Sequence, residues 1–434
     1  MLDEKEIIRR RDMREVFTFT IDPADAKDFD DALSFAVQED GSFQIGVHIA
    51  DVSFYVKPGT PVDDEAYKRG TSVYLVDRVI PMLPEELCND KCSLKPGEDK
   101  LCMSVIFTMD SEAKVLKHKI CRTVIRSDAR LNYDEAQAIL TQKCERDFIE
   151  QALHTFNSLA QKLRAERIAH GALTIEQPEM RFHLDKNGHP TDIYFEQPNE
   201  AHHLIEEFML LANRTVATSV GSGRPFVYRV HDLPDSDKLE EVKKFKKQYS
   251  ARWRKMENGQ SQMANIIDMM IIRAQAKAVY STYNIGHYGL AFSHYTHFTS
   301  PIRRYPDLMV HRLVDKYILT GKKETMPREE MELMCEHCSA CEQEATQAER
   351  DSIKQFQTLW IADHLGEVLP GHIIAMVDFG FFVQLDESHC EGLVRMETIE
   401  HPEDFVLGDP VNVQIVRADI NKSQIDMEIM DQKA

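Results

Sequence analysis

Five aspartates fall within ten residues near the start of the chain, in the run Asp22-Pro-Ala-Asp-Ala-Lys-Asp-Phe-Asp-Asp31. Carboxylates packed this closely repel one another unless a cation lies among them. Oxygen ligands without Cys or His beside them suit Mg²⁺ or Mn²⁺, which keep water ligands and take up substrate phosphates. The run follows a stretch of β-formers and encloses the apolar Phe29, so we favour a metal site over a solvated acidic loop. An EF-hand calcium loop would need a glycine and a late glutamate that this run lacks.

A second run, residues 287–307, gathers histidine, hydroxyl and arginine side chains. Arg303 and Arg304 stand beside small and hydroxyl residues, which suits bidentate contacts with phosphate. His294 and His297 are spaced as metal ligands can be, but no helical glutamate accompanies them, so we do not expect a metal there. By composition alone, the run equally fits the start of an ordinary helix with two surface arginines.

Two further clusters have a structural explanation beside a chemical one. The Cys and His residues at positions 335, 337, 338 and 341 have helical spacing, so they cannot all converge on one zinc ion. We interpret them as packing residues. The stretch 243–255 holds seven Lys and Arg residues interleaved with Phe245, Tyr249 and Trp253. It could follow a nucleic-acid backbone or form a solvated helix face.

The elements that must position these residues change in kind along the chain. Up to about residue 125, β-formers alternate with turn signals such as Asp40-Gly41, which predicts short strands and a hairpin. From about Asp134 the apolar residues recur three and four apart, which predicts helices. The strands expected in the first part are 16–21, 32–37, 43–49 and 105–108. The helical stretches expected after it are 134–170, 200–220 and 237–364, with a β-like insertion at 181–195.

The last 69 residues, 366–434, have the turn spacing of a small five-stranded barrel. They contain 4 basic and 14 acidic residues, a net charge of −10, which is half of the −20 of the whole chain. Net negative charge argues against binding a polyanion, because phosphate contacts depend on Lys and Arg. Since the charge is uneven, this argument applies to the barrel, and we expect nucleic acid to be held mainly by the preceding part. The expected strands are 367–373, 380–385, 392–395, 411–416 and 424–429.

Length and composition set outer bounds on the class of protein. The 434 residues suffice for about three domains, or for one large domain and a small one. Nine cysteines, an odd number over a long chain, fit reduced thiols in the cytoplasm better than a disulfide framework. We expect neither a secretory signal nor a membrane span, because the charged N-terminal stretch has no apolar segment and no run of 18 apolar residues occurs.

Two stretches together resemble signature sequences of the ribonuclease II/ribonuclease R (RNB exoribonuclease) family, and their wording is closest to the ribonuclease R branch. The first covers residues 20–33 and contains the acidic run, and the second covers residues 295–308 and contains both arginines. Further matches occur in family order, and the resemblance spans about residues 11–354. These further matches lie at residues 80–84, 92–94, 206–213, 228–232 and 348–351.

The resemblance implies a magnesium-dependent 3′→5′ exoribonuclease, with Mn²⁺ as the alternative ion. Such an enzyme hydrolyses single-stranded RNA from a free 3′ end, processively, to nucleoside 5′-monophosphates, and we expect it to act as a cytoplasmic monomer in RNA decay and quality control. The alternative is a non-catalytic RNA-binding regulator on the same fold, which the loss of a site aspartate would favour. A magnesium-dependent DNA exonuclease on an unrelated fold is disfavoured by the barrel and the motifs. The implied metal ligands are Asp22, Asp28, Asp30 and Asp31.

Within that set, Asp22 and Asp31 are the most direct ligands that the resemblance implies, and Asp30 is the least replaceable. Arg303 matches the arginine that contacts the scissile phosphate, and Glu349 matches the glutamate near the 3′-terminal nucleotide. With these two, Asp28 and Asp30 complete the implied catalytic set. Tyr74 matches the aromatic residue that guides the terminal base, and Phe182 or a neighbour would supply an opposing stack. The other RNA-binding residues that we expect are His297, Ser300, Arg304 and Tyr305.

We therefore expect an α+β chain. A catalytic domain with a mixed or antiparallel sheet packed with helices precedes a small all-β OB-fold barrel of the S1 type. The resemblance to the S1 type rests on residues 371–383 and 391–394, where Phe379, Phe381 and Phe382 are candidates for stacking on bases. The expected boundaries are a charged, solvated linker remnant at 1–15, the catalytic domain at 16–365 and the S1-like domain at 366–434.

Overall fold

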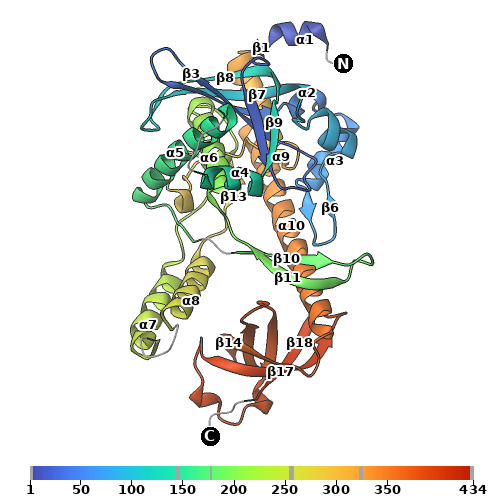
Figure 1. The fold of residues 1–434 in the computed structure, drawn as a ribbon, viewed down its shortest axis with the longest axis vertical. Helices are drawn as coiled ribbons and strands as arrows, with labels where there is room; N and C mark the ends of the chain where they lie inside the picture. Colours follow the sequence, from blue (N-terminus) through green and yellow to red (C-terminus); the bar gives the residue numbers. More distant parts are fainter. Residues whose placement is uncertain (1–2, 143–146, 176–177, 254–258, 322–325, 431–434) are drawn as a thin grey trace.

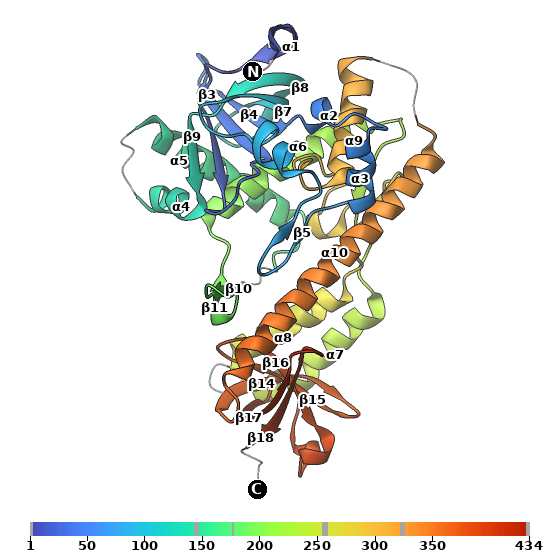
Figure 2. The same ribbon diagram turned by 90° about the vertical axis from the view of Figure 1, so that its right-hand side faces the viewer.

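The computed structural model describes residues 3–142, 147–175, 178–253, 259–321 and 326–430. Two lobes lie along the long axis of the molecule, an upper lobe built on a large sheet and a lower lobe that is a closed barrel (Figure 1). The helix α10 (Arg328–Ala362) runs from the upper lobe down to the barrel (Figure 2). The α+β class with a separate C-terminal barrel, which the sequence predicted, is confirmed.

The large sheet has seven strands in the order β1-β8-β7-β4-β3-β2-β9. Neighbours from β8 to β2 pair antiparallel, whereas β1 and β9 at the two edges pair parallel. The sheet is therefore mixed and mostly antiparallel, as expected. Strand β7 is buried along nearly its whole length, so residues 101–109 are mostly apolar on both faces rather than alternating. The strands are β1 (Arg11–Asp12), β2 (Thr18–Asp22), β3 (Asp31–Val37), β4 (Phe43–Ala50), β7 (Asp99–Met109), β8 (Val115–Arg126) and β9 (Ala129–Asn132).

Helices pack against this sheet through a cluster of phenylalanine rings. Phe156 of α5 lies edge-on to Phe19 of β2 at 5.5 Å and to Phe208 of α6 at 4.9 Å. Asn132 and Asn199 form capping boxes that start α4 and α6, which fixes where these helices begin. The helices are α1 (Glu4–Arg9), α2 (Val52–Tyr55), α3 (Pro61–Arg69), α4 (Tyr133–Thr141), α5 (Phe148–Ala169), α6 (Glu200–Val220), α7 (Ser236–Trp253), α8 (Gly259–Ala274) and α9 (Tyr305–Val314).

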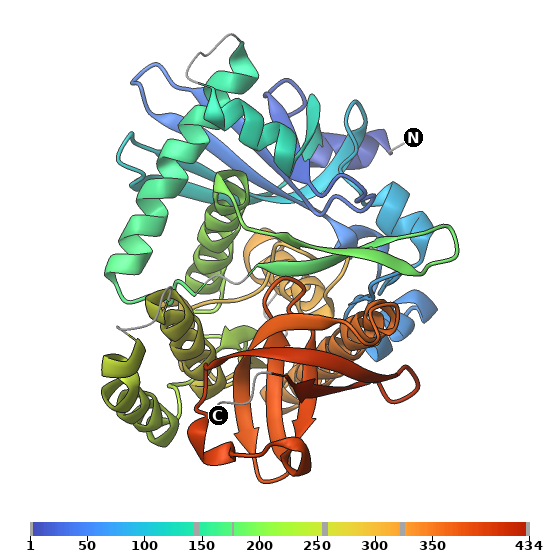
Figure 3. The same cartoon turned by 60° about the horizontal axis from the view of Figure 1, so that its bottom comes forward.

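Three two-stranded sheets connect the larger parts. The pair β10–β11 lies between the upper lobe and the barrel (Figure 3), and Ile193 of β11 packs against the barrel core. No helix within the described ranges is long and apolar enough to cross a membrane. The paired strands are β5 (Val73–Tyr74) with β6 (Val79–Ile80), β10 (Glu179–Leu184) with β11 (Pro190–Glu196), and β12 (Tyr228–Val230) with β13 (Val279–Ser281). Single helical turns of other types are η1 (Leu87–Lys91), η2 (Tyr288–Leu290), η3 (Asp315–Leu319), η4 (Met396–Thr398) and η5 (Pro402–Asp404).

The barrel closes in the order β14-β15-β16-β18-β17. All five predicted strands are present, and three of them are longer than the sequence indicated. The buried Ile361 near the end of α10 belongs to the barrel core, so the long helix and the barrel share apolar contacts. The strands are β14 (Val368–Val377), β15 (Gly380–Leu385), β16 (Glu391–Arg395), β17 (Pro410–Asp419) and β18 (Gln424–Ile429).

Two expectations about the chain were wrong. The solvated lead-in expected over residues 1–15 ends before Arg10, which is buried and donates to Asp51 Oδ2 at 2.7 Å and to the carbonyl of Cys102 at 3.1 Å, whereas residues 3–9 are exposed or half-buried. The sequence could not reveal this partner, which lies 41 residues away. The helical stretch predicted over 237–364 is interrupted, because residues 275–304 form β13, a short turn and loops. Glycines, serines, threonines and Pro301 in that segment favour turns over a helix.

Candidate active site

The acidic run is the connection between two neighbouring strands of the large sheet. Asp22 ends β2 and Asp31 begins β3, so both ends of the run emerge at the same edge. Ser93 holds the middle of the run, since its hydroxyl accepts from Phe29 N–H at 3.0 Å and donates to the Lys27 carbonyl at 2.8 Å. These bonds fix the backbone from which Asp28 and Asp30 project.

Arg130 supports the other half of the run, and no motif in the sequence indicated this role. It lies on β9, which pairs in parallel with β2. Its Nη2 donates to the carbonyls of Pro23 at 3.1 Å and Ala24 at 2.8 Å, and its guanidinium lies 5.1 Å from the centroid of the Phe29 ring. Arg130 therefore holds both the backbone and an apolar side chain of the acidic run.

Burial raises the pKa values of four carboxylates in the run. Asp30 is only 6% exposed, and this burial raises its pKa well above the ordinary range, although Arg303 opposes the shift. Burial also raises the pKa values of Asp22 and Asp31, and the charge of Asp22 adds to the effect at Asp31. The pKa of Asp28 is raised by burial as well. These groups therefore resist carrying negative charge together unless a cation compensates them.

Several observations bear on whether these residues fit a metal ion. Oδ2 of Asp22 is buried and has no hydrogen-bond partner among the described residues. A hard cation would satisfy that oxygen and relieve the repulsion, and an all-oxygen donor set matches Mg²⁺ or Mn²⁺. Within the described ranges, no group of three or more His, Cys, Asp or Glu side chains is already arranged to hold a metal ion. The donors fit the ion by chemistry, and binding it would draw the carboxylates together.

Residues 296–304 carry Arg303 to the acidic run. Ile302 N–H donates to Asp30 Oδ1 at 2.9 Å, and Arg303 Nε lies 3.8 Å from Asp30 Oδ2. The Arg303 side chain keeps 42% of its surface exposed, so its guanidinium can still reach an incoming group. Its Nη2 donates to Ser300 Oγ at 3.1 Å. The structure thus brings a predicted phosphate-binding arginine next to a predicted metal-binding carboxylate that is far away in the sequence.

Arg304 and Tyr305, expected to contact RNA, lie instead in the protein interior. Arg304 donates to both oxygens of the buried Asp307 at 2.9 Å, and its side chain is 17% exposed. The buried Tyr305 donates its hydroxyl to Asp63 Oδ1 at 2.9 Å. Both residues support the start of α9 rather than an open surface, and the sequence could not show this because Asp63 is 242 residues away.

His297 and Ser300 are also committed to neighbours inside the protein. His297 Nδ1 and the Tyr280 hydroxyl are 2.8 Å apart, and burial lowers the histidine pKa well below its ordinary value. His297 is therefore neutral and cannot supply positive charge to a phosphate. Ser300 is buried, and its N–H donates to Asp307 Oδ1 at 2.8 Å. We reassign both residues from contacting RNA to positioning the loop that carries Arg303.

The remaining predicted residues lie along α10. Glu349 Oε1 accepts from the backbone N–H of Tyr74 at 3.1 Å, so the glutamate holds the β5–β6 hairpin. Tyr74 is 41% exposed, which leaves its ring available to a ligand. Phe182 on β10 packs on Phe356 of α10, with ring centroids 5.8 Å apart. Residues 349 and 356 are seven positions apart on the helix, so the two aromatic residues dock about 10 Å apart along it.

The Cys/His cluster at 335–341 and the basic stretch at 243–255 lie in different surroundings, one in the core and the other partly on the surface. Cys335 and Cys338 are buried in the core, and His337 Nε2 lies 2.8 Å from the Tyr67 carbonyl. In the basic stretch, Phe245 packs with Ile266 of α8. The lysines of residues 243–247 are exposed on α7, and the side chains of residues 249–255 lie outside the described part of the chain.

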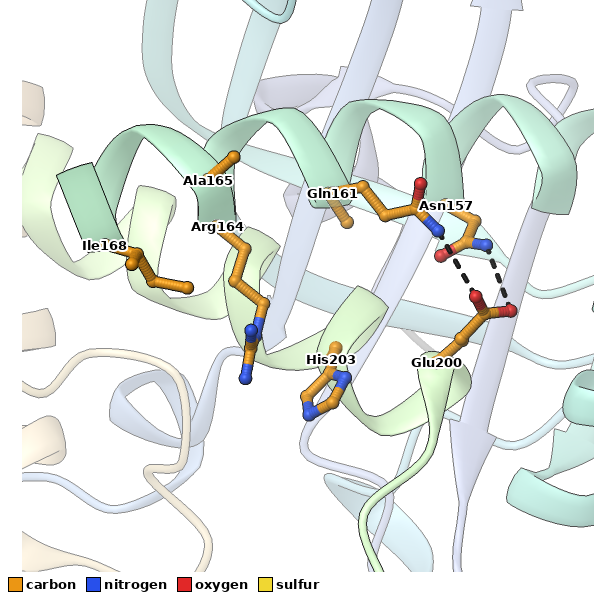
Figure 4. Close-up of a pocket in the computed structure, with 8 residues that line it drawn as sticks. Asn157, Gln161, Arg164, Ala165, Ile168, Glu200 and His203 are labelled. Atoms are coloured by element: carbon orange, nitrogen blue, oxygen red, sulfur yellow. Dashed lines mark hydrogen bonds between the residues drawn. The ribbon is translucent and has the colours of Figure 1, made fainter. Parts of the chain in front are cut away.

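A cavity of about 260 Å³ lies between α5 and α6 and contains none of the predicted site residues. Figure 4 shows that Glu200 turns its carboxylate toward Asn157 and Gln161, whose amides donate to it at 3.5 and 3.3 Å. Three of its polar side chains, Asn157, Gln161 and Glu200, are thus directed at one another. The cavity therefore offers no competing catalytic constellation.

The sequence matches the RNB domain over residues 10–320 and the S1 RNA binding domain over residues 363–430. The first match covers well over half of the chain, so the chain belongs to the RNB family, and the predicted resemblance is confirmed. The chain is similar to ribonuclease R of Aquifex aeolicus, with 38% identity over 99% of this chain and 66% of that protein. It thus spans less than two thirds of that relative's length.

Solved structures agree with this assignment. The RNase R of Mycoplasma genitalium in complex with ribose methylated single-stranded RNA has a TM-score of 0.91 and 26% identity, over 99% of this chain and 73% of that one. The fold also occurs in yeast Ssd1, described as a pseudonuclease, with a TM-score of 0.74 and 19% identity over 96% of this chain and 54% of that one. Since that likeness concerns the fold alone, the fold by itself does not decide whether a protein of this shape cleaves RNA.

Proposed function

We propose that this chain is a 3′→5′ exoribonuclease that hydrolyses single-stranded RNA processively from a free 3′ end and releases nucleoside 5′-monophosphates. One observation carries the proposal: the half-exposed guanidinium of Arg303 lies 3.8 Å from the buried carboxylate of Asp30, within a set of aspartates whose charge is uncompensated. An accessible guanidinium beside carboxylates that would hold a metal ion suits a phosphodiester substrate. The curated relative named ribonuclease R supports the same reaction class.

The cofactor in this proposal is Mg²⁺, with Mn²⁺ as the alternative, held by Asp22, Asp28, Asp30 and Asp31. When bound, such an ion supplies a nucleophile from water near neutral pH and neutralises charge on the phosphate oxygens. The protein's contribution is to hold the carboxylates. Ser93 and Arg130 do so through the backbone of the run, and Ile302 N–H does so through Asp30 itself.

Arg303 stabilises the negative charge that develops on the non-bridging oxygens of the scissile phosphate. Its guanidinium is already oriented by Ser300 and Asp30, so little reorganisation is needed during the reaction. The ring of Tyr74 stacks on the terminal base, and stacking tolerates any base because every base has a π face. Such a site requires a single strand, which fits an enzyme that degrades RNA without sequence preference.

The cysteines favour action in a reducing compartment. The eight cysteines that the structure describes are free thiols, and seven of them are buried. Free thiols are typical of the cytoplasm. We therefore place the activity in the cytoplasm. Separately, we propose that the enzyme acts as a monomer.

The function is tested by incubating 5′-labelled single-stranded RNA with the protein in Mg²⁺ or in EDTA. Asp30→Asn is compared with Asp25→Asn, a matched control because Asp25 is exposed in the same run. We expect stepwise shortening by the wild type and by Asp25→Asn in Mg²⁺, release of nucleoside monophosphates, and no shortening by Asp30→Asn or in EDTA. RNA binding without shortening by the wild type would instead support the alternative, a non-catalytic RNA-binding regulator. Equal shortening by Asp30→Asn would overturn the proposed site.

A further inference from the structure

The β5–β6 hairpin that carries Tyr74 is held on both of its edges. On the inner edge, Tyr74 pairs with Val79, and Leu75 N–H donates to the Arg78 carbonyl at 2.9 Å. On the outer edge, Tyr74 N–H donates to Glu349 Oε1 at 3.1 Å and Val76 N–H donates to Ser352 Oγ at 3.1 Å. Tyr74 is the last residue of β5, and Val76 lies in the bend that follows, where its N–H is directed at the same helix. Side chains of α10 thus accept the hydrogen bonds that a neighbouring strand would otherwise accept from the hairpin.

The two acceptors on α10, Glu349 and Ser352, are spaced so that each reaches one of the two donors, Tyr74 N–H and Val76 N–H. Glu349 and Ser352 are three residues apart on one helix, a rise of about 4.5 Å. Tyr74 ends β5, and Val76 lies two residues further on in the bend that leads to β6, so the two residues are separated by at most about 6.6 Å along the chain. The longer glutamate side chain covers the difference. Neither bond alone would fix both the position and the rotation of so short a strand.

The same segment is tied to Arg303 at its other end. Ser72 N–H donates to the Arg303 carbonyl at 2.9 Å, and Thr71 Oγ1 donates to that carbonyl at 3.1 Å. Ser72 Oγ in turn accepts from Met82 N–H at 2.8 Å, which closes the base of the hairpin. A continuous series of hydrogen bonds therefore runs from α10 through the hairpin to the arginine of the site.

We propose that Ser352 is a positioning residue that sets the distance between the stacking ring of Tyr74 and the guanidinium of Arg303. This rests on the proposed function, in which Tyr74 holds the terminal base and Arg303 the scissile phosphate. With the hydroxyl of Ser352 removed, the outer edge of the hairpin keeps only Glu349, and Val76 loses its partner. The terminal nucleotide then stacks on a ring that no longer has a fixed position relative to the phosphate. Bound RNA is aligned for cleavage less often, so kcat falls while KM changes little.

Ser352→Ala, Ser352→Thr and Tyr74→Ala are compared with Gln355→Ala, a control because Gln355 is exposed on the same helix. Each is assayed on single-stranded RNA and on the same RNA ending in a 3′-abasic ribose. On base-bearing RNA we expect Ser352→Ala to lower kcat about three- to tenfold, the effect of losing one hydrogen bond. Ser352→Thr should restore kcat, and Gln355→Ala should leave it unchanged.

On the abasic RNA, which offers no terminal base to stack, we expect Ser352→Ala and the wild type to cleave at the same rate. On base-bearing RNA, the double variant Ser352→Ala with Tyr74→Ala should cleave no more slowly than Tyr74→Ala alone. An equal loss on both substrates, or additive losses in the double variant, would overturn the proposal and leave the exonuclease assignment intact. A wild type inactive on both RNAs would overturn the proposed function and this positioning role with it.

Discussion

Negative charge is concentrated in two regions of this molecule, the acidic run and the C-terminal barrel, and they hold it differently. On the barrel, carboxylates such as Asp386, Glu387 and Glu428 are exposed to water. In the acidic run, Asp30 is 6% exposed and its pKa is raised well above the ordinary range by burial. Water relieves the repulsion on the barrel, whereas in the proposed site a cation does so for the run. Burial, rather than the number of charges, separates a reactive site from an acidic surface.

The largest effect that follows from this comparison is at Asp30. We expect Asp30→Asn to lower the rate of RNA cleavage by at least about 10²-fold, because it removes a charge that the metal and Arg303 both use. RNA binding at low salt should change little, since carboxylates do not attract phosphates. Single-turnover kinetics and filter binding measure the two effects. A loss of binding that matched the loss of rate would contradict the assigned role.

The next prediction separates the two adjacent arginines. Arg303→Ala should lower cleavage by on the order of 10²-fold, the usual effect of removing a donor to developing charge, with an unchanged Tm. Arg304→Ala should instead destabilise the fold by about 3 kcal/mol, because it leaves the buried Asp307 without its partner. Thermal denaturation and initial rates on both variants check this. Equal rates and equal Tm values for the two variants would contradict the distinction.

A smaller effect is expected at Arg130, which holds the acidic run without belonging to it. Arg130→Met keeps the aliphatic stem over Phe29 but removes the bonds to Pro23 and Ala24. We expect cleavage to fall about tenfold, the loss associated with hydrogen bonds from a charged donor. Arg126→Met on the exposed end of β8 is the control and should cleave like the wild type. A wild-type rate for Arg130→Met would show that the backbone of the run holds its position unaided.

The smallest effect is expected on the barrel. Asp426 pairs with Arg395 at 3.2 Å near the surface, and such pairs contribute at most about 1 kcal/mol. Asp426→Asn should therefore change the cleavage rate less than about twofold and leave Tm nearly unchanged. Initial rates and thermal denaturation test it. A large loss in either measurement would mean that the carboxylates of the barrel and of the acidic run do not differ as described here.

The strands, the barrel and the acidic run could be predicted from the sequence because their signals are local. Alternating β-formers lead directly into Asp22, and the closely spaced aspartates have no other explanation as simple as a cation. The placement of Arg303 beside Asp30 came from the family resemblance, and no local pattern could have indicated a contact between residues so far apart in the sequence.

The errors share one physical cause, which is that polar side chains expected at the surface bind partners inside the protein. Arg304 and Tyr305 fit a phosphate-binding surface by composition, yet Asp307 and Asp63 bind them inside the protein. Arg10 fits a solvated segment by composition, yet Asp51 binds it in the interior. Arg130 had no signal at all, because a single arginine on a strand looks the same whether it braces a loop or faces water.

Titration calorimetry with Mg²⁺ tests the central claim, that burial makes the acidic run a metal site, most directly. The wild type, Asp30→Asn and Asp25→Asn are titrated without RNA, so the result does not depend on catalysis. We predict equal affinities for the wild type and Asp25→Asn, and an affinity at least about tenfold lower for Asp30→Asn. No binding by the wild type, or the same loss in both variants, would contradict the claim.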